Sequence, residues 1–222
     1  MLVGEICRLN ADTHQLDLCC GKAEMLCQWS RQWGIRGTGV DISGTFLEAA
    51  RNRAIELGVA DRITLVEDDA AQYAPKRLEY DVVSCIGATW IGDGLAGTLD
   101  HMLPTLKSDG LLLVGEPYWI VPPPEAAYEL MGVTENQYTS LAGTLDRIES
   151  SGLELVEMVL ANPDGWDRYV AAQWMAVDNW LRAKPSDADA EALRAWNAHW
   201  KRIYLEYQRD YFGWGIFVTR IK

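Results

Sequence analysis

Several features are absent or scarce in this chain of 222 residues, and each absence excludes a class of protein. No apolar run approaches the ~20 residues needed to cross a bilayer, and Glu5 and Arg8 interrupt the N-terminus where a secretory signal would be apolar. The five cysteines lack the paired Cys-x-x-Cys spacing of a zinc site. We therefore expect a soluble, cytoplasmic protein with reduced, buried thiols, no metal site and no membrane partner.

Positive charge is also scarce. The chain has 20 lysine and arginine residues against 32 aspartate and glutamate residues, and no basic cluster offsets the net charge of −12. Because such a field repels a phosphate backbone, nucleic acid is not an expected partner. The balance suits cationic or neutral small substrates. The sequence does not indicate the oligomeric state, and none of the three histidines lies where a general base is expected.

The chain does contain a regular alternation of short apolar runs and helix-period segments through its first 160 residues. This pattern predicts an α/β fold with a Rossmann-like, mostly parallel sheet and helices on both faces. The length suits a single domain over residues 1–222. Predicted strands lie around 15–19, 36–41, 62–66, 80–86, 110–116, 153–161 and 214–220, with helices near 22–33, 44–57, 95–107 and 134–151.

About fifty residues separate the last two predicted strands, and this stretch carries many of the ten tryptophans. A structureless loop of that length is improbable in a compact domain. Apolar residues recur at helical spacing over 164–182 and again after Ser186, which is suited to cap a second helix. We therefore predict a helical insertion over 163–212, a hairpin that packs on the sheet domain or forms a wall of the substrate site.

The most informative segments are HQLDLCCGKAEM at 14–25 and IRGTGVDIS at 35–43. A first strand ends near Asp17 and runs into a tight turn around Gly21, and a second strand ends on Asp41. Dinucleotides and S-adenosylmethionine both use such an arrangement. A dinucleotide needs two or three glycines to approach its pyrophosphate, whereas this turn has one, and Asp17 would repel the phosphates. The same carboxylate suits the ammonium group of a methionine moiety.

Acids also follow the next strands. Asp41 comes twenty residues after Gly21, the distance at which a strand-end acid accepts hydrogen bonds from ribose hydroxyls. The third strand, ITLVEDDA, ends in Asp69 and Ala70, which offer a carboxylate and a backbone N–H to the edge of an adenine. The fourth strand ends at Ile86, which we expect beside the cofactor.

The order and content of these segments resemble a class I S-adenosylmethionine-dependent methyltransferase. The resemblance covers residues 14–162 and the last strand, and it implies that this last strand runs antiparallel between the fifth and the sixth. The family's glycine-rich motif aligns with Cys19, Gly21 and Ala23, so two of its three glycines are replaced here by small residues. The resemblance implies S-adenosylmethionine as cofactor and S-adenosylhomocysteine as product. It implies cofactor contacts by Asp17, Cys19, Gly21, Asp41, Ile42, Asp69, Ala70 and Ile86.

The methyl acceptor is expected beyond the ends of the fourth and fifth strands. The segment GEPYW at 115–119 and the tryptophan-rich insertion are similar to a group of uncharacterised bacterial small-molecule methyltransferases. We predict Glu116 as substrate anchor or general base and Tyr118 as a hydrogen-bond donor to the acceptor. Aromatic side chains predicted to contact the substrate are those of Trp90, Trp119 and Trp166.

The predicted function is transfer of a methyl group to a small molecule by in-line displacement. A cofactor-binding protein without transferase activity is an alternative, because the glycine motif is altered. A protein or RNA methyltransferase is another alternative, although the negative charge disfavours RNA. A nicotinamide-dependent oxidoreductase is disfavoured by Asp17 and the single glycine of the turn.

Overall fold

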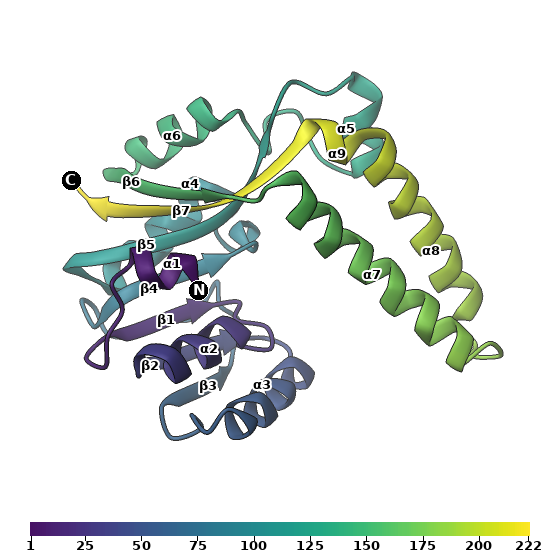
Figure 1. Cartoon of the computed structure of the whole chain (residues 1–222). Coiled ribbons are helices and arrows are strands. Elements are labelled where there is room, and N and C mark those ends of the chain that lie inside the picture. Colours follow the sequence, from purple (N-terminus) through teal and green to yellow (C-terminus); the bar gives the residue numbers. More distant parts are fainter. The chain divides into compact units, whose positions relative to one another are not determined.

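The computed structural model describes residues 1–222, which form two compact units. We call the first the sheet unit; it comprises Met1–Glu116, Gly143–Val159 and Gly215–Lys222. We call the second the helical unit; it comprises Pro117–Ala142 and Leu160–Trp214. Figure 1 shows the elements of both. No helix of the structure combines the length and the apolarity needed to span a bilayer.

The sheet has seven strands in the order β3-β2-β1-β4-β5-β7-β6. The pairs β1–β2, β1–β4, β2–β3 and β4–β5 are parallel. The last strand lies between the fifth and the sixth and runs antiparallel, so the predicted fold class is confirmed (Figure 1). The strands are β1 (His14–Leu18), β2 (Arg36–Asp41), β3 (Ile63–Glu67), β4 (Tyr80–Ile86), β5 (Leu106–Trp119), β6 (Leu153–Leu160) and β7 (Phe212–Ile221).

The parallel strands bring the residues at their carboxyl ends to one edge of the sheet. Asp17 pairs with Gly39, and Ile86 pairs with Gly115 in the next strand. The central strands are buried on both faces, as expected for a sheet covered on both sides; Leu16, Val83 and Leu112 are among the fully buried side chains. The edge that carries the predicted cofactor residues is therefore built on a rigid core.

The helices of the sheet unit begin and end at recognisable signals. The Ser43 hydroxyl accepts the Phe46 N–H and caps the helix after β2, and Gly34, in the left-handed conformation, ends the helix before β2. These helices are α1 (Leu2–Ile6), α2 (Glu24–Trp33), α3 (Gly44–Glu56) and α4 (Leu95–Met102), with the 3-10 turns η1 (Thr89–Gly92) and η2 (Leu103–Thr105). The helix α6 (Leu141–Ser150) belongs to the sheet unit from its third residue, Gly143, onward.

Three predicted boundaries are wrong. The helix predicted over 95–107 ends at Met102, because Pro104 forms a short 3-10 turn and β5 starts at Leu106. Gly110 therefore lies inside β5, where an added Cβ would press on the carbonyl of Asp81. The helix predicted over 134–151 starts only at Leu141, and a separate short helix, α5 (Glu125–Met131), precedes it after the three prolines.

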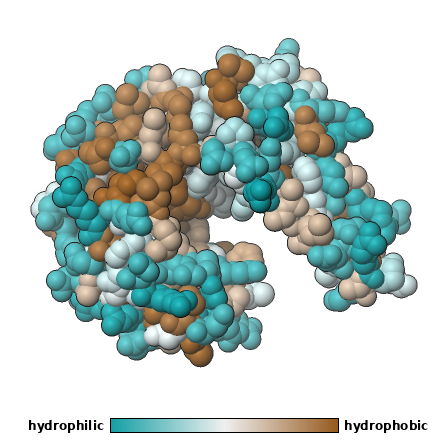
Figure 2. Space-filling model, viewed as in Figure 1, coloured by the Kyte–Doolittle hydropathy of each residue, from teal (hydrophilic) through white to brown (hydrophobic).

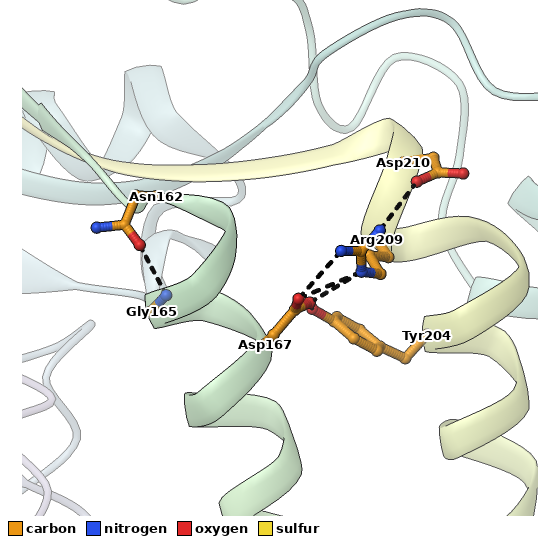
Figure 3. Close-up of polar contacts among 6 residues, drawn as sticks. All are labelled: Asn162, Gly165, Asp167, Tyr204, Arg209 and Asp210. Carbon is orange, nitrogen blue, oxygen red and sulfur yellow. Dashed lines mark hydrogen bonds and ion pairs between the residues drawn. The ribbon is translucent and has the colours of Figure 1, made fainter.

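The helical unit contains the two long helices predicted for the insertion, but the second starts at Ala190 after Asp189, so the predicted cap at Ser186 is wrong. They are α7 (Pro163–Ala183) and α8 (Ala190–Ile203), and α8 continues through the π-turn η3 (Tyr204–Gln208) and α9 (Arg209–Tyr211) into β7. The Asn162 side chain caps α7 by accepting the Gly165 N–H at 2.7 Å (Figure 3). No residue of α7 is fully buried, and hydrophilic residues cover much of the hairpin surface (Figure 2).

Asp167 joins α7 to the end of the second helix. Its carboxylate accepts the Tyr204 hydroxyl at 2.5 Å and the Arg209 Nε at 3.2 Å, so the π-turn residue Tyr204 points toward α7 (Figure 3). The Tyr204 hydroxyl and the Arg209 guanidinium hold the pKa of the Asp167 carboxyl below its usual range. A π-turn places one extra residue in the helix, which re-aims the side chains that follow it.

Candidate functional site

The turn after β1 adopts an unusual backbone at each position of the predicted glycine motif. Cys19, Gly21 and Ala23 have positive φ values of 55°, 57° and 51°. Only glycine adopts this left-handed region without steric cost, so Cys19 and Ala23 are strained. The turn therefore retains the shape that three glycines would produce, although two of them are replaced.

Replacing Ala23 with glycine is expected to stabilise the free protein by up to about 1 kcal/mol. The left-handed conformation costs alanine roughly 1–2 kcal/mol, and the greater freedom of glycine in the unfolded chain returns part of this. Urea unfolding measures the difference. The matched control is Ala54→Gly in the interior of α3, which we expect to destabilise the protein by about 1 kcal/mol. Equal losses in both variants would contradict the strain at Ala23.

Asp41, at the end of β2, holds two backbone amides of this edge. One carboxylate oxygen accepts the Gly21 N–H at 2.8 Å, and the other accepts the Ser43 N–H at 2.9 Å. A carboxylate has about four acceptor sites, so each oxygen keeps a lone pair for a further donor. Asp41 thus fixes the turn to the second strand and can still bind a pair of hydroxyls.

Asp17 is buried at the end of β1, where it accepts the Ser84 hydroxyl at 2.6 Å. Gln15 donates its side-chain amide to the same hydroxyl, which extends the polar chain into the sheet. Burial raises the pKa of Asp17 to about 7, the Ser84 hydrogen bond lowers it, and the Asp41 charge raises it. A positively charged ligand group near Asp17 would favour the ionised form and reverse part of this effect.

The loop after β3 carries the residues predicted for the adenine. The exposed Asp69 accepts the Ala71 N–H at 2.9 Å, which orders the loop, and the ring of His101 lies 2.9 Å from the carbonyl oxygen of the buried Ala70. Ile42, directly after Asp41, is 73% exposed. An isoleucine so exposed beside buried carboxylates offers an apolar surface to a flat ligand.

Glu116, near the end of β5, is only 2% exposed. Its Oε2 accepts the Thr89 hydroxyl at 2.5 Å, and the Thr89 carbonyl in turn accepts the Thr98 hydroxyl at 2.6 Å. Burial raises the pKa of Glu116 to about 7, while the Thr89 hydrogen bond and the charge of Arg147 lower it. Such a carboxyl changes its charge near neutral pH, as a general base should.

The predicted aromatic contacts fall in different surroundings. In the sheet unit, Trp90 is 72% exposed. In the helical unit, Trp119 is buried among Tyr128, Tyr138 and Phe212, and Trp166 stacks on Trp214 with ring centroids 5.8 Å apart.

Tyr118 is also buried in the helical unit, which raises the pKa of its hydroxyl. Its ring occupies the space where a side chain of Gly213 would lie. The substrate roles of Tyr118, Trp119 and Trp166 stay predictions.

Comparisons with known proteins agree with this geometry. A family model described as a methyltransferase domain matches residues 16–110, which include the end of β1, the turn at Gly21 and the strands β2 to β4. A crystal structure of an S-adenosylmethionine-dependent methyltransferase from Geobacter sulfurreducens, in complex with S-adenosyl-L-homocysteine, is 42% identical with a TM-score of 0.94. The match covers 100% of this chain and 89% of that chain. This chain belongs to the S-adenosylmethionine-dependent methyltransferases.

Two further relatives extend the comparison. A methyltransferase structure from Thiobacillus denitrificans, also with S-adenosyl-L-homocysteine, is 40% identical with a TM-score of 0.93, and the match covers 100% of this chain and 90% of that one. The uncharacterized protein YjhP of Escherichia coli is 42% identical over 217 residues, which are 97% of this chain and 87% of its relative. The methyltransferase thus has relatives that match its whole length, helical unit included.

Sequence reasoning did not identify the partners of three polar residues of the methyltransferase, Ser84, Thr89 and His101. Each bonds a residue at least 27 positions away, so its partner depends on strand register and helix placement. Ser84 alone had a usable signal, because a serine within an otherwise apolar strand needs a buried partner.

Proposed function

We propose that this methyltransferase transfers the methyl group to a small-molecule acceptor by in-line displacement, with Glu116 as the base. When bound, S-adenosylmethionine supplies a methyl group that its sulfonium already activates. The chain therefore has to align the acceptor, exclude water and take up a proton. The observation that carries the proposal is the buried carboxyl of Glu116 at the carboxyl end of β5, with a pKa of about 7.

The cofactor assignment within the site rests on residues that fit the molecule. Asp41 has free acceptor sites for the ribose hydroxyls, and Asp69 with Ala70 offers an acceptor and a donor to the adenine edge. Ile42 supplies an exposed apolar surface beside them, and Ile86 ends β4 at the same edge. Asp17, Cys19 and Gly21 are assigned to the methionine end, where the positively charged ammonium would lie close to a buried carboxyl.

An acceptor of low molecular weight is supported by the charge of the chain. At a net charge of −12, a nucleic acid acceptor would meet repulsion, whereas a small neutral or cationic molecule would not. Tyr118 follows Glu116 by two positions on the same strand, β5. We assign to Tyr118 a hydrogen bond to the acceptor.

The test is transfer of a labelled methyl group in a bacterial extract, after calorimetry has shown that the protein binds S-adenosyl-L-homocysteine. We expect the label in the low-molecular-weight fraction, with at least a hundredfold loss for Glu116→Gln. Label recovered in the protein or RNA fraction would refute the small-molecule acceptor. Unchanged transfer by Glu116→Gln would refute its role as the base. The matched control, Glu149→Gln on the exposed side of α6, should retain full activity.

A further inference from the structure

The surroundings of Glu116 narrow the chemistry of the acceptor. The carboxyl belongs to the sheet unit, and three features of that unit define what it can bind. They are the hydrogen bond from Thr89, the exposed ring of Trp90 and the exposed carboxylate of Asp93. We propose that the methyl acceptor is a small amine, whose nitrogen is bound as a cation by Glu116 and the Trp90 ring and is deprotonated by Glu116. This inference rests on the proposed function.

The first step of the argument is the fixed position of the carboxyl. Thr89 donates its hydroxyl to Oε2 of Glu116, and Thr98 holds the Thr89 backbone by donating to its carbonyl. Thr98 also accepts the Gly92 N–H at 3.2 Å, so the whole η1 turn is tied to α4. Thr89 is therefore a positioning residue, because its hydroxyl holds the Oε2 atom of Glu116.

The second step is the exposed tryptophan. Trp90 follows Thr89 directly on η1, and 72% of its surface is accessible. A tryptophan face attracts cations more strongly than other aromatic rings do. Trp90 is linked to Glu116 through the adjacent Thr89, and an aromatic ring together with a carboxylate suits an ammonium group.

The third step is charge. Asp93, at the end of η1, is exposed and carries a second negative charge close to Trp90 in sequence, and the whole chain carries −12. Arg147 places a positive charge near Glu116, but the negative charges of Glu116 and Asp93 outweigh it, so they would repel an acceptor with a carboxylate or phosphate at its reactive end. A cation would be attracted from solution to this end of the sheet.

The fourth step compares two kinds of proton donor to Glu116. The pKa of Glu116 is about 7, and an alkylammonium has a pKa of about 10, so the pKa of the proton donor exceeds that of Glu116 by about 3. An aliphatic hydroxyl, with a pKa near that of water at about 16, would leave a gap of about 9. Glu116 is thus matched to an amine and mismatched to an alcohol.

The reaction then balances as follows. The ammonium gives a proton to the Glu116 carboxylate, and the freed nitrogen lone pair forms a bond to the methyl carbon. The carbon–sulfur bond breaks, and its electron pair stays on sulfur, which loses its positive charge. The products are a methylated ammonium, S-adenosylhomocysteine and a protonated Glu116, which returns its proton to water.

The test uses the full-length protein saturated with S-adenosyl-L-homocysteine and needs no turnover. Ethylamine, benzylamine, benzyl alcohol and benzoate are titrated separately, and binding is followed by the indole N–H signal of Trp90, assigned with Trp90→Phe. We expect at least one amine to bind tenfold or more tightly than benzyl alcohol, and benzoate not to bind. Measured by calorimetry, which needs no signal from Trp90, amine binding should weaken by about tenfold in Trp90→Ala and in Glu116→Gln. Trp196→Ala, which removes an exposed tryptophan of the helical unit, should not weaken it.

A second measurement isolates the role of Thr89. Thr89→Val should raise the pH at which amine binding is half-maximal, because the carboxylate loses a hydrogen bond that favours its ionised form; Thr89→Ser should restore the wild-type midpoint. Equal or tighter binding of benzyl alcohol, or binding of neither amine, would overturn the inference. Loss of S-adenosyl-L-homocysteine binding in the wild-type protein would instead refute the proposed function, so the two failures are distinguishable.

Discussion

Replacing Asp41 with alanine is expected to weaken the binding of S-adenosyl-L-homocysteine by a hundredfold or more. Each hydrogen bond from a ribose hydroxyl to the carboxylate contributes about 1.5–3 kcal/mol, and the variant loses two. It also leaves the N–H groups of Gly21 and Ser43 without the acceptor that now orients the turn. Calorimetric titration of both proteins with S-adenosyl-L-homocysteine measures the effect.

Two variants make this result specific. Asp41→Asn keeps one acceptor oxygen and should lose only about tenfold in affinity, which separates the contact with the ligand from collapse of the turn. Asp61→Ala removes an exposed acid at the opposite, amino-terminal end of β3 and should leave the affinity unchanged. Affinity within threefold of wild type in Asp41→Ala would show that the ribose hydroxyls are bound elsewhere.

The positions of the strand-end acids are predictable from the sequence because they depend on local patterns. Asp41 and Asp69 each follow a short apolar run, and parallel strands bring such ends to one edge whatever the details of packing. The long helices of the insertion are predictable for the same reason, since their apolar spacing persists over many residues.

The parts that sequence reasoning missed depend on long-range geometry. The bond from Thr89 to Glu116 is one example, because nothing local indicates that the Thr89 hydroxyl would meet a carboxyl 27 residues later. The strain at Cys19 and Ala23 follows from backbone angles that neither residue favours by itself. The sequence shows that glycines are missing there, whereas only the structure shows that the turn keeps their conformation.

Replacing Glu116 with glutamine is expected to stabilise the cofactor-free protein at alkaline pH and not at acidic pH. The pKa of Glu116 is raised from 4.5 to about 7 by burial, so its protonated form is favoured in the folded state. The stability that this supplies is complete below pH 4.5 and is lost as the pH rises through 7. Glutamine does not titrate, so the free energy of unfolding of the variant, relative to that of wild type, should rise by roughly 2.5 kcal/mol between pH 5 and pH 8.5.

Urea unfolding of both proteins gives the difference in free energy of unfolding between Glu116→Gln and wild type at each of the two pH values. The gain is the change in this difference from the lower to the higher pH. Asp17, whose pKa is also about 7, titrates equally in both proteins and cancels. Glu149→Gln, an exposed carboxyl on α6, serves as control and should show no such change. A constant stability difference across the pH range would mean that Glu116 is ionised throughout. Gain of stability together with loss of methyl transfer would instead show that the protein keeps a costly buried charge because its reaction needs a base at that position.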